Sequence, residues 1–344
     1  MNVILKNGDA MQVAENATCL QAASAISEGL ARNAVCAKVN GEEVDLSHVL
    51  KEGDALEIVT LKDKEGLHVY RHTCAHVLAQ ALKTIYPTCK LSIGPVIENG
   101  FYYDVDFVTP INKDDLAKIE AEMQKIIKSN LPIERFTLPR EEAIKLMDGY
   151  DEKYKVELIE GLEDGTISFY TNGNFTDLCR GPHLPHMGYV KAIKLTSVAG
   201  AYWRGNENNK MLTRIYGITF PKKSMLDEYL AMLEEAKKRD HRKLGKELEL
   251  FCFSPRVGAG LPLWLPKGAA LRDRLEHFLR NVQKQYGYLQ VITPHIGMKD
   301  LYVTSGHYAK YGKDSFQPIH TPDDSEEFLL KPMNCPHHCE IYRW

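Results

Sequence analysis

Short runs in which apolar and polar residues alternate open the chain and predict two hairpins within residues 1–61. The pairs Asn7-Gly8 and Asn40-Gly41 each separate two such runs and suit a type I′ turn. Between them, helical spacing falls on Leu20, Ala23, Ile26 and Leu30, and the run ALEIVTL predicts a closing strand. Two hairpins around one helix are typical of a β-grasp domain, although a generic small α+β domain fits the pattern equally well.

A charged stretch at residues 62–66, KDKEG, predicts a linker, and a helix follows it. From residue 101 to 107 apolar and polar side chains alternate, which predicts a half-buried strand. Another helix is expected at 112–129, and mixed helix and strand signals continue to about residue 220. This region therefore predicts a second α+β domain.

One long helix is predicted over residues 222–245, and it ends in the basic stretch KKRDHRK. That cluster is either a solvated helix face or, if RNA is a ligand, a place for phosphate contacts. The last hundred residues predict a helix at 269–286, a strand ending at Pro294, and a strand, turn and helix in FLLKPMNCPHHCEIYRW. The final helix has no capping residue near its end, which suggests a piece of a longer protein.

Composition narrows the class of protein. The chain has 344 residues, 44% of them apolar, and 43 basic against 46 acidic residues, so a nucleic-acid surface would have to come from local clusters. Its eight cysteines form no CxxC pair, as expected of reduced thiols. Neither a signal peptide nor a membrane span is recognisable, and we expect a cytoplasmic protein.

Two histidines four residues apart, His72 and His76, are the first candidate for chemistry. At about 100° per residue they share a helix face with Gln80 and Lys83, opposite an apolar face, so we expect them away from the core. The spacing fits two histidines that simply face water. It also fits two of the groups that make up a metal site or an acid–base site. The flanking residues are not those of an HExxH zinc protease.

A second pair, Cys179 and His183, lies beside Asp177 and Arg180 in FTDLCRGPHLP. Three histidines and a cysteine could hold zinc tetrahedrally, or could position water and an ester for acid–base chemistry without a metal. The sequence leaves both possibilities open. It contains no P-loop and no dinucleotide-binding GxGxxG motif.

Several motifs together resemble the threonyl-tRNA synthetase family, in the order and at the approximate spacing of that family. They are RHTCAHVLAQAL, IGPVIENGFYYD, DLCRGPH, AGAYWRG, KRDHRKLG and KPMNCPHH. The resemblance covers the whole chain. It implies an α+β multidomain protein with a TGS-like β-grasp domain (1–61), an editing domain (62–221), a linker helix (222–245) and the start of a class II antiparallel-sheet catalytic domain (246–344).

The same resemblance implies roles for particular residues. His72, His76, Cys179 and His183 match the editing cleft of the family, and Lys155 and Asp177 match further cleft positions. The family's editing site is thought to work without metal, whereas the alanyl relatives place zinc on the equivalent groups, and we expect the metal-free form here. Cys335 matches the first ligand of the catalytic zinc, and His337 and His338 are interpreted as loop residues.

The implied activity is that of a threonine–tRNA ligase, which uses ATP with Mg²⁺, threonine and tRNA(Thr), functions as a homodimer and edits seryl-tRNA(Thr). Because the ATP-binding motifs and two further zinc ligands are expected beyond Trp344, we expect the chain itself not to aminoacylate. Two alternatives are a stand-alone editing hydrolase and a non-enzymatic RNA-binding or regulatory protein.

Overall fold

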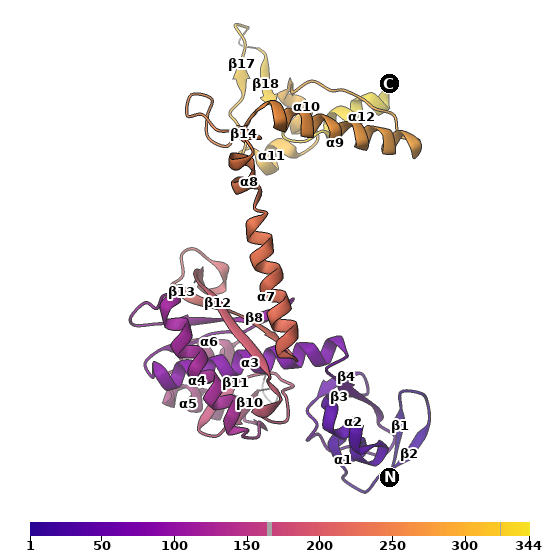
Figure 1. Cartoon of the computed structure of the whole chain (residues 1–344), viewed down its shortest axis with the longest axis vertical. Coiled ribbons are helices and arrows are strands. Elements are labelled where there is room, and N and C mark those ends of the chain that lie inside the picture. Colours follow the sequence, from indigo (N-terminus) through magenta and orange to yellow (C-terminus); the bar gives the residue numbers. More distant parts are fainter. Residues whose placement is uncertain (164–166, 324) are drawn as a thin grey trace. The chain divides into compact units, whose positions relative to one another are not determined.

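The computed structural model describes residues 1–163, 167–323 and 325–344 (Figure 1). The chain divides into two compact units, Met1–Ala236 and Lys237–Trp344. Both contain helices together with largely antiparallel sheets, so the chain has the predicted α+β multidomain class. None of the helices that the structure describes combines the length and the apolar character needed to cross a membrane.

The first sheet has the strand order β2-β1-β5-β3-β4, in which β1 and β5 are parallel and the other pairs antiparallel. Its elements are β1 (Asn2–Leu5), β2 (Ala10–Gln12), α1 (Cys19–Ile26), α2 (Glu28–Asn33), β3 (Ala34–Val39), β4 (Glu42–Val44) and β5 (Ala55–Thr60). Val3, Ala22, Leu46 and Leu56 belong to its core. This is the β-grasp arrangement that the two hairpins and the helix predicted.

The two predicted type I′ turns differ. Asn40 and Gly41 both have positive φ, as a type I′ turn requires. In the first hairpin Gly8 has a positive φ and Asn7 does not. The Gly8 N–H donates a hydrogen bond to the Leu5 carbonyl. The four residues between β1 and β2 give room for a longer turn that ends in a left-handed glycine.

The helix predicted between the hairpins is interrupted at Ser27, whose extended backbone ends α1 and whose side chain accepts a hydrogen bond from the Leu30 N–H at the start of α2. Leu20 and Ile26 of the predicted apolar stripe are exposed, and the buried face of α1 is Cys19, Ala22 and Ala23. Of the predicted stripe Ala23 is confirmed as buried, whereas Leu20 and Ile26 are wrong, because small side chains and not the large ones meet the sheet.

A second sheet has the order β12-β13-β8-β6, with β7 also paired to β8. Its strands are antiparallel, and α3 and α4 pack together on its buried face. These elements are α3 (Lys64–Ile85), β6 (Lys90–Leu91), β7 (Val96–Ile97), β8 (Gly100–Asp106), α4 (Leu116–Ser129), β12 (Ala192–Tyr202) and β13 (Met211–Phe220). Strand β8 confirms the strand predicted at residues 101–107, and α4 the helix predicted at 112–129. The strand is not half-buried as predicted, because Asp104 and Asp106 on its polar face pair with Arg214 and Lys210 and are only 3% and 6% exposed.

The predicted linker at residues 62–66 is mostly the first turn of α3, which starts at Lys64 behind Asp63. Val35, Cys36 and Val59 of the β-grasp sheet lie in the same buried cluster as the apolar residues of α3. The charged stretch therefore does not act as a spacer, because the two parts share a core.

A third sheet, in the order β11-β10-β9, covers the other side of α3 and brings a loop toward it. It consists of β9 (Glu134–Thr137), β10 (Ser168–Asn172) and β11 (Phe175–Leu178), with α5 (Arg140–Gly149) and α6 (Lys153–Glu160) in the same region. His76 and Gln80 are each only 7% exposed as a result. The expectation that the histidine face of α3 lies away from the core is wrong, since a second layer buries that face.

The long helix predicted at 222–245 is two helices, α7 (Lys223–Lys238) and α8 (His241–Glu247). The Asp240 side chain accepts a hydrogen bond from the Arg242 N–H and caps the second helix. The predicted continuity is therefore wrong at Asp240, because a capping aspartate starts a new helix there.

The unit Lys237–Trp344 contains two small antiparallel sheets, β14-β15 and β16-β18-β17. Its remaining elements are β14 (Phe251–Cys252), β15 (Leu263–Trp264), α9 (Pro266–Gln285), β16 (Ile296–Met298), α10 (Lys299–Thr304), α11 (His307–Tyr311), β17 (Ile319–His320), β18 (Glu327–Leu330) and α12 (Cys335–Arg343). Helix α9 and the final strand and helix agree with the sequence prediction.

Two local predictions in this unit are wrong. Residues 288–294 form no strand, and Leu289 and Ile292 are about nine-tenths exposed, because no other described strand pairs with them. His337 and His338 lie in α12 and not in a loop, since Pro336 at the start of that helix is well tolerated there.

Candidate functional site

Helix α3 presents His72 and His76 to the loop that follows β11. The His72 Nε2 atom lies 2.9 Å from Cys179 Sγ, and Cys179 Sγ lies 3.2 Å from His183 Nε2. The rings of His72 and His183 are stacked with centroids 4.5 Å apart, and those of His76 and His183 are 4.2 Å apart. Two motifs more than a hundred residues apart therefore meet at one place.

Lys155 of α6 and Asp177 of β11 form a buried ion pair beside these histidines. Lys155 Nζ lies 2.7 Å from Asp177 Oδ1, and the two residues are only 3% and 2% exposed. Tyr103 of β8 joins them, since its hydroxyl accepts from Lys155 Nζ at 3.0 Å and donates to Asp177 Oδ2 at 2.9 Å. Such a fully bonded buried pair is held rigidly, because either partner alone would be a costly buried charge.

A cavity of about 400 Å³ opens next to these groups. His72, His76, Lys155, Asp177 and Cys179 all line it, whereas His183 does not and is only 2% exposed. His183 therefore lies behind Cys179, with its Nδ1 3.1 Å from the Thr73 hydroxyl. Further lining residues are His68, Ser92, Ile93, Gly94, Pro95, Val96, Tyr103, Leu158, Leu178 and Arg180.

Burial keeps the three histidines uncharged. It lowers the pKa of His72 to about 3, helped by the neighbouring His76, and lowers the pKa of His76 to about 4 against the opposing effect of Asp177. Burial also lowers the pKa of His183 well below its usual value. At neutral pH the imidazoles can therefore accept a proton or a hydrogen bond.

The two acidic groups of the site differ in charge. Burial raises the pKa of the Cys179 thiol to about 12, so the sulfur stays protonated. Burial acts in the same direction on Asp177, but the Lys155 ammonium, His76 and the hydrogen bond from Tyr103 together outweigh it and lower the pKa of that carboxyl. The site thus combines neutral imidazoles and a thiol with one carboxylate–ammonium pair.

The donor set also fits zinc by chemistry. His72, His76, Cys179 and His183 offer ligand atoms that all lie within 4.8 Å of one another. Imidazole nitrogen and thiolate sulfur are both ligands that zinc binds tetrahedrally in proteins. As placed, the donors contact each other directly at 2.9 and 3.2 Å, closer than the edge of roughly 3.5 Å that tetrahedral zinc bonds imply.

The surroundings of Cys335 differ from those of the four donors. It is exposed at the start of α12, and among the described residues it belongs to no group of three or more potential metal ligands. A zinc site needs three or four protein ligands, so the residues present here do not form one around Cys335.

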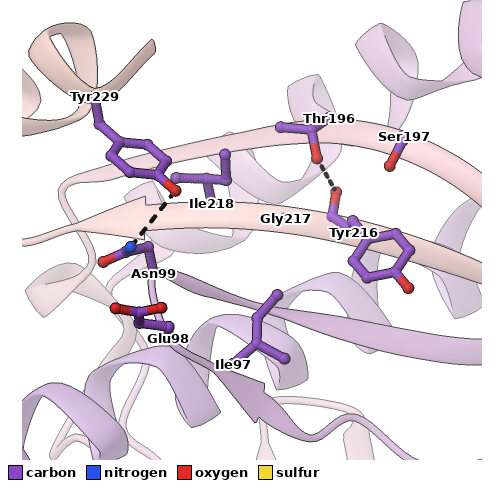
Figure 2. A pocket seen from close by; sticks show the side chains of 9 residues that line it. All are labelled: Ile97, Glu98, Asn99, Thr196, Ser197, Tyr216, Gly217, Ile218 and Tyr229. Carbon is purple, nitrogen blue, oxygen red and sulfur yellow. Dashed lines mark hydrogen bonds between the residues drawn. The ribbon is translucent and has the colours of Figure 1, made fainter. Parts of the chain in front are cut away.

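A second cavity, of about 370 Å³, lies on the opposite face of the second sheet beside α7 (Figure 2). Figure 2 shows the Tyr229 hydroxyl near Asn99 Nδ2, at 3.5 Å, and the Thr196 hydroxyl donating to the Tyr216 carbonyl. Glu98 is the only carboxylate in its lining, and no histidine or cysteine lines it. The histidine cavity is therefore the stronger candidate for catalysis.

Sequence reasoning missed Tyr103 and Thr73. Tyr103 lies on the buried face of its strand, and only its hydroxyl makes it part of the ion-pair network. Thr73 stands between the two histidine positions, and its hydroxyl bonds the Val69 carbonyl, as helix threonines often do. Neither position carries a signal that sequence spacing alone would reveal.

Comparisons with known proteins relate the chain to tRNA synthetases. The TGS domain model matches residues 1–60, and the model described as threonyl and alanyl tRNA synthetase second additional domain matches residues 167–216. A threonine–tRNA ligase of Azobacteroides pseudotrichonymphae genomovar. CFP2 is 57% identical over 345 residues, covering 100% of this chain and 53% of the relative. Over its whole length the chain is similar to threonine–tRNA ligases.

Other relatives are similarly close in sequence. The threonine–tRNA ligase of Parabacteroides distasonis is 55% identical over 344 residues, covering 100% of this chain and 53% of that protein. A crystal structure described as the RNA binding domain of threonyl-tRNA synthetase from Cryptosporidium parvum Iowa II is 44% identical over 30% of this chain and 26% of that one, with a TM-score of 0.29. The chain spans about half the length of the curated relatives it matches.

Proposed function

We propose that this chain is part of a threonine–tRNA ligase and that its histidine cavity hydrolyses serine esterified to tRNA(Thr). The longer enzyme would activate threonine with ATP and Mg²⁺ and transfer it to tRNA(Thr). The observation that carries the editing proposal is the cavity lined by His72, His76, Cys179 and the Lys155–Asp177 pair. Neutral imidazoles beside a fixed ammonium group suit the hydrolysis of a neutral ester.

In the proposed reaction, a water oxygen attacks the carbonyl carbon of the seryl ester. His72 accepts or orients the water proton, and the bond between that carbon and the ribose oxygen breaks. The ribose oxygen leaves with a proton, which gives free serine and tRNA. A base as weak as a buried, neutral His72 acts chiefly by orienting water, since the most efficient general bases have a pKa near the working pH.

Lys155 is proposed to stabilise the oxyanion that forms on the carbonyl oxygen. A lysine ammonium has three N–H donors, and among the described residues two of them serve Asp177 and Tyr103. The third can donate to a ligand in the cavity that Lys155 lines. Because its first two bonds fix the ammonium group, little reorganisation is needed when charge develops.

An editing site makes physical sense in a threonine enzyme. Serine lacks only one methyl group of threonine, and a missing methyl or methylene is worth about 1–3 kcal/mol in binding. This difference is too small for accurate selection at a single site. A second, hydrolytic site that removes serine supplies the additional discrimination.

Two cofactor proposals belong to the same enzyme. Zinc at the editing cavity would be held by His72, His76, Cys179 and His183, and it would lower the pKa of a water that took the place of one of these ligands. We favour the metal-free form, which the direct contacts among these donors support. The catalytic zinc that Cys335 is proposed to bind would need ligands other than those around it here, so no step is assigned to it.

The unit Lys237–Trp344 is proposed to belong to a class II catalytic domain, and the boundaries 1–61, 62–221, 222–245 and 246–344 remain our proposal for the domains. Leu275, Phe278 and Leu279 of α9 are each more than half exposed, as are Leu289 and Ile292 in the segment that follows. Apolar residues exposed together mark surfaces that another protein surface covers. They support the proposal that the longer enzyme is a homodimer.

The variants His72→Ala and Lys155→Ala test the catalytic assignment in this 344-residue chain. Loss of a water-orienting group or of an oxyanion donor should lower kcat for seryl-tRNA(Thr) hydrolysis by about 10²-fold. The matched controls His277→Ala and Lys145→Ala, both exposed and neither in the lining of the cavity, should keep the wild-type rate. Wild-type rates in both site variants would refute these roles.

The same assay separates the two alternatives. A non-enzymatic RNA-binding protein would bind tRNA(Thr) with strong salt dependence and release no serine. A stand-alone editing hydrolase would release serine, and the gene would not continue past Trp344 into ATP-binding motifs.

A further inference from the structure

The β-grasp domain contributes one side chain to the region of the histidine cavity. Asp45 directly follows β4, and its Oδ1 atom accepts a hydrogen bond of 2.9 Å from the His183 backbone N–H. Its Oδ2 atom accepts a second bond of 2.7 Å from the Tyr170 hydroxyl of β10. One carboxylate thus holds both the loop that carries His183 and the strand behind it.

Tyr170 fits closely into the same loop. Its hydroxyl would lie 1.8 Å from a Cβ atom added at Gly181, whose φ is +71°, so only glycine fits there. The Tyr170 ring also contacts the His183 ring edge-on, with centroids 4.4 Å apart, and Tyr170 is 2% exposed. Tyr170 therefore supports His183 from behind, and Asp45 fixes the hydroxyl end of Tyr170.

A continuous set of contacts leads from Asp45 to the cavity. Asp45 bonds the His183 backbone, His183 Nε2 contacts Cys179 Sγ at 3.2 Å, and Cys179 Sγ contacts His72 Nε2 at 2.9 Å. Of these residues, Cys179 and His72 line the cavity. A shift of the His183 loop would therefore move the two groups that face the substrate.

Asp45 is itself held in place by its domain. Val35 and Val59 of the β-grasp sheet are buried in the core that contains α3, and Lys38 Nζ pairs with Glu65 of α3 at 2.5 Å. The Tyr189 hydroxyl also donates to the Arg32 carbonyl of α2. Several contacts besides those of Asp45 thus join the domain to its neighbour, so the carboxylate has a defined position.

We propose that Asp45 is a positioning residue for hydrolysis, through which the β-grasp domain fixes the loop of Cys179 and His183. The effect of Asp45 on hydrolysis rests on the proposed editing function. Its role in fixing the loop of Cys179 and His183 does not depend on that function. It assigns to the N-terminal domain a direct contribution to the chemistry of the neighbouring domain.

The kinetic test uses Asp45→Ala, Asp45→Asn and Tyr170→Phe in the 344-residue chain with seryl-tRNA(Thr). Because Asp45 lies outside the cavity lining, Asp45→Ala should lower kcat by about tenfold or more and change KM by less than about threefold. Asn keeps an oxygen that can accept from the His183 N–H, so Asp45→Asn should recover part of the rate. Glu42→Gln removes an exposed acidic charge nearby on β4 and should match wild type.

A double variant tests whether Asp45 and Tyr170 act together. If both act through the His183 loop, the combined Asp45→Ala and Tyr170→Phe change should cost less than the product of the two single effects. The proposal would be overturned if the fold-loss of kcat in the double variant equalled the product of the two single losses. It would also be overturned if Asp45→Ala had the same kcat as Glu42→Gln.

Hydrogen exchange supplies a readout that needs no substrate. Exchange of the His183 amide, followed by mass spectrometry of the segment 180–186, should rise by about tenfold in Asp45→Ala and stay unchanged in Glu42→Gln. If wild type releases no serine but this difference is seen, the editing function fails while the positioning contact stands. Equal exchange in Asp45→Ala and wild type would refute the positioning contact, whatever the activity.

Discussion

At the scale of single residues, the site depends on a charge pair that water barely reaches. Lys155 and Asp177 are almost fully buried, and Tyr103 bonds both. Removing one member of such a pair leaves the other as an unpaired buried charge, whereas removing one exposed lysine from a carboxylate costs little.

Asp177→Ala should therefore lower the free energy of unfolding by about 3–5 kcal/mol, because the Lys155 ammonium stays buried without its counter-charge. Lys210→Ala is the matched comparison, since Lys210 also pairs with a buried aspartate, Asp106, but is itself exposed. We expect that change to cost about 1 kcal/mol or less. Urea unfolding measures both values, and similar costs for the two variants would contradict the burial argument.

The pairing of residues across the site was predictable only in part. The HxxxH spacing correctly placed His72 and His76 on one helix face, and the resemblance to the family related them to Cys179 and His183. Asp45 gave no such signal, because its role depends on how one domain packs against another. Sequence spacing describes neighbours along an element and carries no information about contacts between domains.

At the scale of elements, α3 is the centre of the first unit. It packs against strands and a helix on one side and against the site loop on the other, and its first turn contacts the β-grasp sheet. A Cβ atom at Gly66 would lie 2.0 Å from the Thr60 carbonyl oxygen, so glycine lets the helix approach the end of β5.

Gly66→Ala should destabilise the chain by about 1–3 kcal/mol, since the backbone of Thr60 has to move to make room. Gly149→Ala is the control, because Gly149 ends α5 and a Cβ atom there would meet nothing within 4 Å. That substitution should be neutral or stabilising by up to about 1 kcal/mol. Thermal unfolding measures the stability of both variants. An unchanged stability of Gly66→Ala would show that the contact between Gly66 and the Thr60 carbonyl is not tight.

Periodicity predicted elements well where one face meets the core and the other meets solvent. Helix α4 is such a case, because Leu116, Ile119 and Met123 are buried on one face. The alternation at residues 101–107 predicted strand β8 correctly but not the burial of Asp104 and Asp106 on its polar face. The same reasoning failed for α3, whose polar face is covered by a second layer, and for residues 288–294, which have strand-like residues but no described partner strand. A pattern of hydrophobicity records the preferences of a segment, whereas burial and pairing depend on what the rest of the chain supplies.

At the scale of the whole molecule, buried neutral histidines connect the site to the pH dependence of stability. An unfolded chain binds protons at histidine near pH 6.5, whereas His72 and His76 in the native chain bind them only near pH 3 and 4. Between these values the unfolded state binds more protons. The free energy of unfolding must therefore fall as the pH falls below about 6.5.

Urea unfolding at pH 7.5 and pH 5.0 should show a loss of at least about 2 kcal/mol at the lower pH. His76→Gln should reduce this pH dependence, because it removes one of the groups that bind a proton on unfolding. His68→Gln, about two turns earlier in the same helix and exposed, should leave it unchanged. The prediction fails if stability is the same at both pH values or if the two variants behave alike.

The central claim is that the histidine cavity is a metal-free editing site, and one assay tests it most directly. The 344-residue chain is incubated with seryl-tRNA(Thr) and, separately, with threonyl-tRNA(Thr), with and without a zinc chelator. We predict that serine is released at the same rate with and without chelator and that threonine stays attached. Release abolished by the chelator would contradict the metal-free mechanism, and no release of serine would contradict the editing function itself.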